Sequence, residues 1–425
     1  MASVTATANL ILILMRSEKG NSVMALEIRP ATEEEMADFF SAFVTAVGFP
    51  FQTTWYIPPP EYTLCAFIDG KIATTYWAWP FTMYFNGRDA SVAGIGAVGT
   101  LPTYRRRGYL RQIIATHFQR MYEDGERSIA ILYPSQAAIY QRFGYDMVTT
   151  QYSWQMRPSD IKFRRPVSVT GTFRAVAHDE VELLQQIYHG FCRERTGCIH
   201  RTHERWQRTV LREPSQGVFS KVVYQEGDKS LGYVLYDIES AGPGYPNQQL
   251  TIRDIAWLTP TAHQAIWQYL VELDLIGNIT LRDITSDDFL PYLLLEPRAP
   301  SIIPPISGLM FTGLMARLVD VPRALTQRNY PVAGQLTFEV RDEFCPWNEG
   351  RWKIETSGGE TSVRKTNSST HMVMPVSTLA LLTFGRISAT EAARMKLLDA
   401  LEPEALPTWD MVMHTAYQPV CKDRF

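Results

Sequence analysis

Apolar and polar residues alternate along several short stretches in the first part of the chain. A period of two predicts β-strands, because successive side chains of a strand point to opposite faces of a sheet. Asp69-Gly70 and Asn86-Gly87 lie between consecutive stretches and are typical of tight hairpin turns. The strands predicted in this way are residues 26–29, 64–68, 72–79, 83–85, 91–99, 129–133 and 149–156.

Three stretches between these strands have apolar residues at helical spacing. Residues 33–44 follow Thr32, a good N-cap, and have acidic residues in the first turn. A second helix is expected from Leu110 to residue 121, and a third over residues 137–143. The resulting order of strands and helices predicts an α+β domain over residues 24–157.

A weaker form of the same pattern follows a linker rich in proline and basic residues at 157–166. Strands are expected at 173–176, 222–225, 232–238 and 250–258, and helices at 180–193 and 261–273. This pattern predicts a second, duplicated domain over residues 158–298, in which the segment 259–263 has no glycine and no arginine. A third region, 299–425, is expected to contain strands at 336–341, 350–355 and 363–366, a strand or helix start at 372–382, and an amphipathic helix from Thr390.

Composition and charge exclude several kinds of protein. The net charge of −3 over 425 residues gives no electrostatic reason to expect a nucleic-acid partner. The five cysteines are scattered, so a disulfide framework is not expected and a reducing cytosol suits the chain. The apolar run at 10–15 is too short to span a membrane. We therefore expect a cytoplasmic protein without membrane contact, and interpret residues 1–23 as an extension before a domain that starts at Met24.

One cluster of cysteine and histidine raises the question of a metal site. Cys192, Cys198, His200 and His203 lie within a dozen residues, but their spacing matches no common structural zinc pattern. A surface helix that starts at Thr202 is the favoured interpretation, and we expect no metal.

The candidate chemistry is concentrated between residues 94 and 110. A predicted strand ends near Thr100 and is followed by Arg105, Arg106, Arg107 and Gly108 at the start of a helix. The N-terminus of a helix presents unpaired backbone N–H groups, which bind anions such as a pyrophosphate. Arginine adds positive charge, and glycine lets the backbone approach a ligand closely.

This stretch resembles the acetyl-CoA loop of the GNAT N-acetyltransferases. Together with the Tyr-x-Arg-Phe-Gly-Tyr segment at 140–145, it is similar to the Eis (enhanced intracellular survival) branch. The resemblance implies an α+β fold of tandem GNAT domains, the second degenerate and without its cofactor loop, followed by a sterol-carrier-like domain over residues 299–425. It also implies a homo-oligomer, a trimer or a hexamer.

The resemblance implies acetyl-CoA as co-substrate and names the residues that bind it. The pantetheine arm would pair with the strand at 98–100, the pyrophosphate would bind the loop N–H groups, and a polar pair follows the next strand. These residues are Val98, Gly99, Thr100, Arg105, Arg106, Arg107, Gly108, Tyr109, Leu110, Arg111, Ser135 and Gln136.

The resemblance also assigns catalytic roles to three residues. Tyr140 would be the general acid that protonates the departing thiolate. The carboxylate of the C-terminal Phe425, ionised at neutral pH, would be the base that accepts a proton from the amine. The N–H group of Ala97 would donate a hydrogen bond to the thioester oxygen.

The acceptor pocket departs from the family pattern. Trp55 matches the pocket tryptophan, whereas Met36 stands in place of a second tryptophan. Thr45 replaces an aspartate and Arg424 replaces the penultimate glutamate, so the pocket is expected to attract polycations less strongly. Acetylation of aminoglycosides is therefore in doubt, and a less charged amine or one with its own carboxylate would suit Arg424 better.

We therefore predict an acetyl-CoA-dependent N-acetyltransferase that transfers acetyl to a small-molecule primary amine by direct attack in a ternary complex. A protein-lysine acetyltransferase is a close alternative, and a non-catalytic acyl-CoA or lipid-binding protein is an alternative from another class. A scaffolding role is favoured for the third domain, because its fold alone does not imply lipid transfer.

Overall fold

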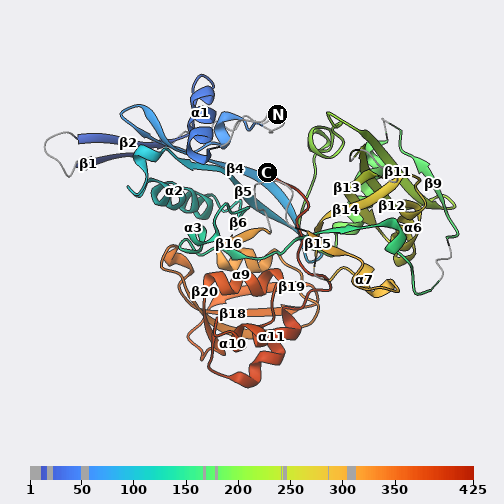
Figure 1. The fold of residues 1–425 in the computed structure, drawn as a ribbon. Helices are drawn as coiled ribbons and strands as arrows, with labels where there is room; N and C mark the ends of the chain where they lie inside the picture. Colours follow the sequence, from blue (N-terminus) through green and yellow to red (C-terminus); the bar gives the residue numbers. More distant parts are fainter. Residues whose placement is uncertain are drawn as a thin grey trace.

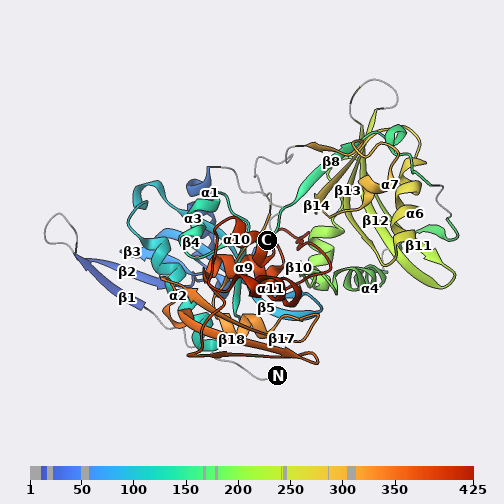
Figure 2. The same cartoon turned by 90° about the horizontal axis from the view of Figure 1, so that it is seen from below.

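The computed structural model describes residues 11–16, 23–48, 57–165, 169–177, 180–240, 242, 247–285, 287–303 and 313–425. The strands of these residues form three sheets, each packed against helices (Figure 1). The C-terminus lies centrally, between the first and second sheets, in both views of the fold (Figure 1 and Figure 2). No helix in the described part of the chain is long and apolar enough to cross a membrane.

The first sheet has nine strands in the order β1-β2-β3-β4-β5-β6-β16-β7, with β10 paired to β4. Its neighbouring strands are antiparallel except β5 and β6, which are parallel. Helix α1 (Met36–Val47) packs on one face of the sheet, and α2 (Tyr109–Asp124) and α3 (Ala137–Gln141) pack on the other. The strands are β1 (Ile11–Arg16), β2 (Val23–Arg29), β3 (Cys65–Ile68), β4 (Lys71–Phe85), β5 (Arg88–Thr100), β6 (Ile129–Leu132), β7 (Asp146–Met147), β10 (Thr196–Ile199) and β16 (Met315–Leu318).

The first helix begins later than the sequence predicted. Helix α1 starts at Met36 rather than at residue 33, because Glu35 is held in a turn before it. Its carboxylate accepts hydrogen bonds from the Arg29 guanidinium at 2.7 and 2.9 Å and from the Thr32 N–H at 2.9 Å. The Arg29 hydrogen bonds and burial act in opposite directions on the pKa of Glu35, and the net result lowers it to about 2.

The prediction of separate strands at 72–79 and 83–85 is also wrong. Both belong to the single long strand β4, whose register with β5 runs through Pro80, opposite Ala93. Proline lacks an N–H, but it interrupts a strand only where that group would be needed for the ladder.

One predicted strand pairs in a different sheet. The stretch 149–156 was expected to close the first sheet, but its strand β8 (Tyr152–Met156) pairs with β14 and β15 of the second sheet. The place between β6 and β7 is taken by β16, which follows the last strand of the second sheet in the chain and is buried along its whole length. Alternation predicts that a strand exists but does not identify its partner, so the pairing of β8 and β16 could not be predicted.

The second sheet has the order β15-β8-β14-β13-β12-β11-β9 and repeats the central pattern of the first, because β13 and β14 are parallel. The expected helices at 180–193 and 261–273 are confirmed as α4 (Val181–Cys192) and α6 (Pro260–Val271). Two shorter helices are α5 (His203–Arg205) and α7 (Leu290–Leu293). The other strands are β9 (Thr172–Ala175), β11 (Val218–Glu226), β12 (Lys229–Ser240), β13 (Gln248–Trp257), β14 (Ile276–Ile284) and β15 (Ser301–Ile303).

The third sheet, β19-β18-β17-β20-β21, forms the C-terminal domain with its helices. Phe338, Trp352 and Trp409 fill its interior, which is continuous with residues of the first sheet. A buried ion pair joins the two domains, since Asp342 accepts hydrogen bonds from Arg317 of β16 at 2.7 and 2.6 Å. The elements are α8 (Val321–Thr326), β17 (Gly334–Arg341), β18 (Gly350–Ser357), β19 (Glu360–Lys365), β20 (Met372–Pro375), α9 (Val376–Phe384), α10 (Ala389–Arg394), β21 (Asp399–Ala400) and α11 (Leu406–Val412).

Candidate active site

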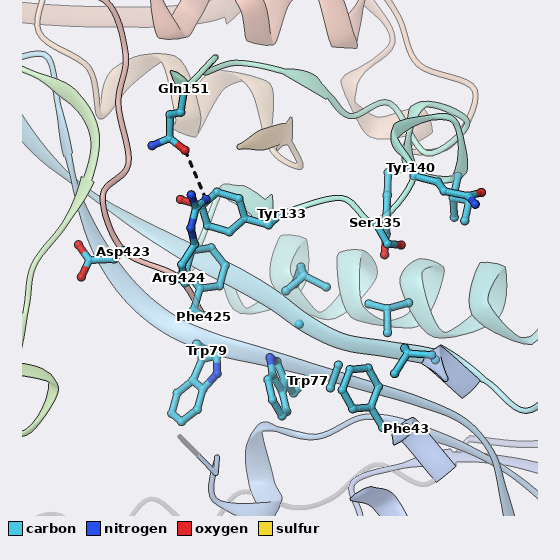
Figure 3. Close-up of a pocket in the computed structure, with 18 of the residues that line it drawn as sticks. Phe43, Trp77, Trp79, Tyr133, Ser135, Tyr140, Gln151, Asp423, Arg424 and Phe425 are labelled. Carbon is cyan, nitrogen blue, oxygen red and sulfur yellow. Dashed lines mark hydrogen bonds between the residues drawn. The ribbon is translucent and has the colours of Figure 1, made fainter. Parts of the chain in front are cut away.

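A cavity of about 2140 Å³ lies where the first sheet, the second sheet and the end of the chain meet. The end of β5, the loop after it, α2 and α3 line one part, and β8, β12, β13 and β14 of the second sheet line another. Residues 422–425 lie between these parts, and Figure 3 shows Phe425 and Tyr140 in the same cavity. The cavity is larger than the usual range for one small ligand, so it has room for two substrates.

The cavity opens because β5 and β6 separate. Their parallel pairing runs from Val92 opposite Ile129 to Ile95 opposite Leu132, where β6 ends while β5 continues. Just beyond this point β5 has a bulge against β4, and Ala97 adopts a φ of +45°. A positive φ is strained for alanine, and such strain is typical of functional sites. The part of β5 from 96 to 100 therefore has an edge that β6 does not cover.

The basic loop ends in an uncapped helix N-terminus. Gly108 is the N-cap of α2, has a φ of +82°, and offers no side chain to the N–H groups of the first turn. A Cβ added at Gly108 would have nothing within 4 Å, so the space in front of the helix is open. Arg106 also has a positive φ, of +63°, which turns the backbone just before the helix. This arrangement provides the N–H groups, helix dipole and room that an anion needs.

Two of the three arginines of the loop donate hydrogen bonds to backbone oxygens. Arg105 donates hydrogen bonds to the backbone oxygens of Thr100 at 3.1 Å and Ala46 at 2.7 Å, so it ties the loop to β5 and α1. Arg107 donates to the oxygen of Thr103 at 3.0 Å. All the co-substrate residues predicted from the sequence line the cavity, namely Val98, Gly99, Thr100, Arg105, Arg106, Arg107, Gly108, Tyr109, Leu110, Arg111, Ser135 and Gln136.

The part of the cavity formed by residues 96–100 and 104–111, here called the co-substrate groove, has the chemistry that acetyl-CoA needs. The uncapped helix and the arginines suit a pyrophosphate, and the uncovered edge of β5 offers backbone groups to the amides of a pantetheine arm. The indole N–H of Trp77 is buried in the cavity wall without a hydrogen-bond partner, as a site that receives a polar ligand would require. A Cβ at Gly96 would lie 1.8 Å from that nitrogen, so only glycine leaves room for the indole there.

Tyr140 projects from α3 and is almost completely buried, with 5% exposed. Burial raises the pKa of its phenol to about 12, although a hydrogen bond with Ser135 acts in the opposite direction. The phenol is therefore protonated at neutral pH and can donate its proton. Ser135 is exposed and lines the same cavity.

The ring of Phe425 packs against aromatic rings of the first sheet. Its centroid lies 5.0 Å from that of Phe81 and 5.4 Å from that of Tyr133. Trp77, Trp79 and Phe81 follow one another on the same face of β4, so they form an aromatic wall that begins at Phe425. Figure 3 shows the two tryptophans in the same cavity as Phe425. Gly96, opposite Trp77 on β5, leaves space for the Trp77 ring, and Gly94, opposite Trp79, leaves space for the rings of Phe81 and Phe425.

A buried ionic cluster beside the end of the chain was not predicted from the sequence. The Arg201 guanidinium donates hydrogen bonds to Asp423 at 2.9 and 3.1 Å and to Asp254. The three side chains are 2–3% exposed. Tyr188 donates a further hydrogen bond to Asp423 at 3.1 Å, and Arg205 donates to the backbone oxygen of Arg424. These partners are far apart in the sequence and follow no motif, so no local signal could have identified them.

The predicted acceptor residues are not brought together. Arg424 lines the cavity, but its guanidinium forms an ion pair with Asp283 and lies over the Tyr133 ring. Met36 and Thr45 both lie on α1 and do not line the cavity; Met36 packs among aromatic residues, and Thr45 is exposed and hydrogen-bonds to Ser41 O. Trp55 lies outside the described residues.

The cysteine and histidine cluster lies where the second domain meets β4 of the first sheet. Cys192 and Cys198 are buried and hydrogen-bonded to each other, and His200 stacks on Tyr84 with centroids 4.0 Å apart. Thr202 caps α5, as predicted, by accepting a hydrogen bond from the N–H of Arg205. Among the described residues there is no group of three or more side chains suited to a metal ion.

Three parts of the chain match models of known protein families. Residues 27–148 and residues 197–318 each match an acetyltransferase (GNAT) domain, and residues 321–422 match a sterol carrier protein domain. The tandem α+β architecture predicted from the sequence is thereby confirmed.

Individual relatives cover most of the chain. An uncharacterized N-acetyltransferase of Streptomyces avermitilis is 28% identical over 78% of this chain and 81% of its own length. N-acetyltransferase Eis of Mycobacterium tuberculosis is 25% identical over 75% of this chain and 77% of its own length. The crystal structure of Eis1 from Mycobacterium abscessus is similar with a TM-score of 0.79 and 25% identity, covering 94% of this chain and 100% of that chain.

Proposed function

Because this chain belongs to the GNAT N-acetyltransferases of the Eis type, we propose that it transfers the acetyl group of acetyl-CoA directly to a primary amine. The observation that supports this most strongly is that the basic loop, Tyr140 and the C-terminal Phe425 line one cavity. A single cavity allows both substrates to be held together, and orientation alone can lower the barrier of such a reaction substantially.

In the proposed reaction the amine nitrogen forms a bond to the thioester carbonyl carbon, and the carbon–sulfur bond breaks. The amine loses one proton and the sulfur gains one, so the chain must accept a proton on one side of the reacting atoms and supply one on the other. The uncovered edge of β5 would hold the thioester between these two sides. The N–H of Ala97, at the bulge, is proposed to donate to the thioester oxygen.

The carboxylate of Phe425 is proposed as the proton acceptor. An α-carboxylate has an ordinary pKa near 3.5 and is ionised at neutral pH. Packing of the Phe425 ring on Phe81 and Tyr133 supports this role, because it restrains a chain end that would otherwise fray.

Tyr140 is proposed as the proton donor. Its burial keeps the phenol protonated, so it can donate a hydrogen bond, and then its proton, as negative charge develops on the leaving sulfur. The hydrogen bond with Ser135 would orient the phenol within α3.

The acceptor is proposed to be an amine with an apolar body. The aromatic wall of Trp77, Trp79 and Phe81 leads to the Phe425 carboxylate, so an apolar group could pack there while the amine meets the carboxylate. Because Asp283 neutralises Arg424, the guanidinium is not an added positive charge in the pocket, and an acceptor carboxylate is no longer required by it.

The test is a comparison of acceptors with acetyl-CoA and purified protein. Monoamines with an aromatic or aliphatic body are expected to give the highest kcat/KM, above aminoglycosides and above peptides that contain lysine. A kcat/KM that is highest for lysine peptides would instead establish the protein-lysine alternative. Acetyl-CoA binding without turnover of any amine would contradict the proposed activity.

The state of assembly remains a prediction from the resemblance, and the compartment remains a prediction from the composition. A trimer or hexamer is expected in solution, and light scattering coupled to size-exclusion chromatography would measure it. Fractionation of the source cells would test the expected cytoplasmic location.

A further inference from the structure

The two acetyltransferase domains open at the same point of their sheets. In the first, the parallel pair β5 and β6 ends at Ile95 opposite Leu132. In the second, the parallel pair β13 and β14 ends at Ile252 opposite Leu281. Just beyond these pairs, β5 has a bulge against β4, and β13 has a bulge against β12. In each bulge the first-named strand has one residue more than its antiparallel neighbour. The second sheet therefore has a cleft that corresponds to the co-substrate groove of the first.

The end of the chain occupies this second cleft. Lys422 Nζ lies 3.5 Å from Asp254 Oδ1 and donates to the backbone oxygen of Ile255, and both partners belong to β13. Arg424 forms its ion pair with Asp283, on β14. Residues 422–424 thus bridge the two strands where they separate, as a ligand would.

Asp423, between these two residues, faces the buried ionic cluster. Arg201 contacts both Asp423 and Asp254, and Tyr233 donates a hydrogen bond to Asp254 at 2.7 Å. Burial alone would raise the pKa of Asp254, but Arg201 and Lys422 outweigh it and the pKa is lowered. The carboxylate is therefore charged, and removing it would leave buried cations without their partner.

The second cleft is not built for a pyrophosphate. The side chain of Thr259 caps α6 by accepting a hydrogen bond from the N–H of Ala262, and Pro260 removes another N–H from the first turn. Helix α2 of the first domain has neither feature, since its N-cap is Gly108. The two clefts share their backbone geometry but differ in what they can bind.

We propose that the cleft of the second acetyltransferase domain is a binding site for the chain's own C-terminal segment, residues 422–424. Asp254, Asp283 and Arg201 are positioning residues that fix this segment and so place the Phe425 carboxylate in the active site of the first domain. The location of the segment follows from the contacts alone, whereas its effect on catalysis rests on the proposed role of that carboxylate.

The test measures the position of the segment separately from activity. A carboxypeptidase specific for C-terminal aromatic residues releases Phe425 only when the segment leaves its cleft, and mass spectrometry follows the loss. Asp254→Asn and Asp283→Asn are compared with the unmodified chain and with Glu180→Gln. Glu180 forms an ion pair with Arg174 in the same domain, without any contact to the segment, and serves as the matched control.

Both aspartate variants are expected to release Phe425 about tenfold faster or more, because each loses a hydrogen-bonded ion pair. Glu180→Gln is expected to stay within about twofold of the unmodified chain. In the aspartate variants kcat should fall while KM for acetyl-CoA stays constant, because the basic loop is untouched. Asp283 is less buried than Asp254, so its variant provides the test if Asp254→Asn fails to fold.

Release at the unmodified rate from folded Asp283→Asn, or from Asp254→Asn, would overturn the proposed binding site. Faster release with an unchanged kcat would uphold the site and contradict the catalytic role of Phe425 instead. The two proposals therefore fail in different ways.

Discussion

The rings of Phe425 and Phe81 pack edge to face, with centroids 5.0 Å apart. Phe81 lies on β4, next to Gly94 of β5, where a Cβ would come within 2.3 Å of the Phe81 ring and 3.0 Å of the Phe425 ring. Any side chain larger than hydrogen at Gly94 would displace one of the two rings. The last residue of the chain is thus packed into the first domain by β4 and β5, strands that also line the cavity.

Tyr140→Phe removes the proposed proton donor without changing the packing of the ring. We expect kcat to fall by about 10²–10⁴-fold, the usual contribution of general acid catalysis, with KM for acetyl-CoA nearly unchanged. Tyr145→Phe is the matched control, since Tyr145 is a buried neighbour with its ring centroid 6.1 Å away and does not line the cavity. Equal losses of kcat in the two variants would contradict the assignment.

The pH dependence of kcat also tests the proposed role of Tyr140. The reaction needs protonated Tyr140, and burial raises the pKa of this phenol to about 12, so its protonated form persists as pH rises through 10. With a saturating acceptor, kcat is expected to show no fall between pH 7 and about 10 from this group. A fall with an apparent pKa of about 8–10 that disappears in Tyr140→Phe would show that the phenol titrates at its ordinary value.

Gly108→Ala tests the helix N-terminus of the basic loop. Alanine at a φ of +82° costs about 1–2 kcal/mol, and a loop that relaxes moves its N–H groups, so acetyl-CoA should bind about fivefold more weakly or worse. Gly70→Ala carries the same strain, at a φ of +76° and with no atom within 4 Å, in a turn away from the cavity. Calorimetry should show weaker acetyl-CoA binding for Gly108→Ala but not for Gly70→Ala, although both substitutions are expected to lower Tm. A shared binding defect would indicate general destabilisation.

Asp342→Asn tests the connection between the first and third domains. The change leaves the Arg317 guanidinium, which is fully buried, without its charged partner, and breaking such a pair costs about 3–5 kcal/mol. Tm is expected to fall by roughly 6–20 °C. The double variant with Arg317→Met should recover much of this loss, because it removes the uncompensated charge. A shift in Tm of under about 2 °C for the single variant would show that the pair is not a structural link.

Much of the fold could be predicted from the sequence because local signals dominate it. Alternating strands, the Asp69-Gly70 turn and the apolar stripe from Leu110 each specify an element by themselves. The placement of β8 and β16 could not be predicted, because the choice of partner strand depends on packing far along the chain. The stretch 149–156 reads as an ordinary strand of the first sheet, and no strand was predicted at Met315–Leu318.

The residues of the candidate site also fall into two groups, those that a local motif predicts and those that come from distant segments. Most of the proposed co-substrate residues lie in the single stretch 98–111, so a local motif predicts them together; Ser135 and Gln136 follow the next strand. Arg201, Asp254 and Asp423 come from three distant segments, and each would be an ordinary surface charge if taken alone. The ion pair of Arg424 could not be predicted for a related reason, since its partner Asp283 lies 141 residues away.

The most direct test of the proposed mechanism exchanges one functional group at the end of the chain. Cys421 allows residues 1–420 to be joined to a synthetic Cys-Lys-Asp-Arg-Phe peptide that ends either in the natural carboxylate or in a carboxamide. All side chains and their packing stay the same, and only the proposed base is lost. We predict that the carboxamide enzyme has a kcat at least about 100-fold below that of the semisynthetic acid, with acetyl-CoA bound equally well. Equal kcat values would contradict the role of the C-terminal carboxylate.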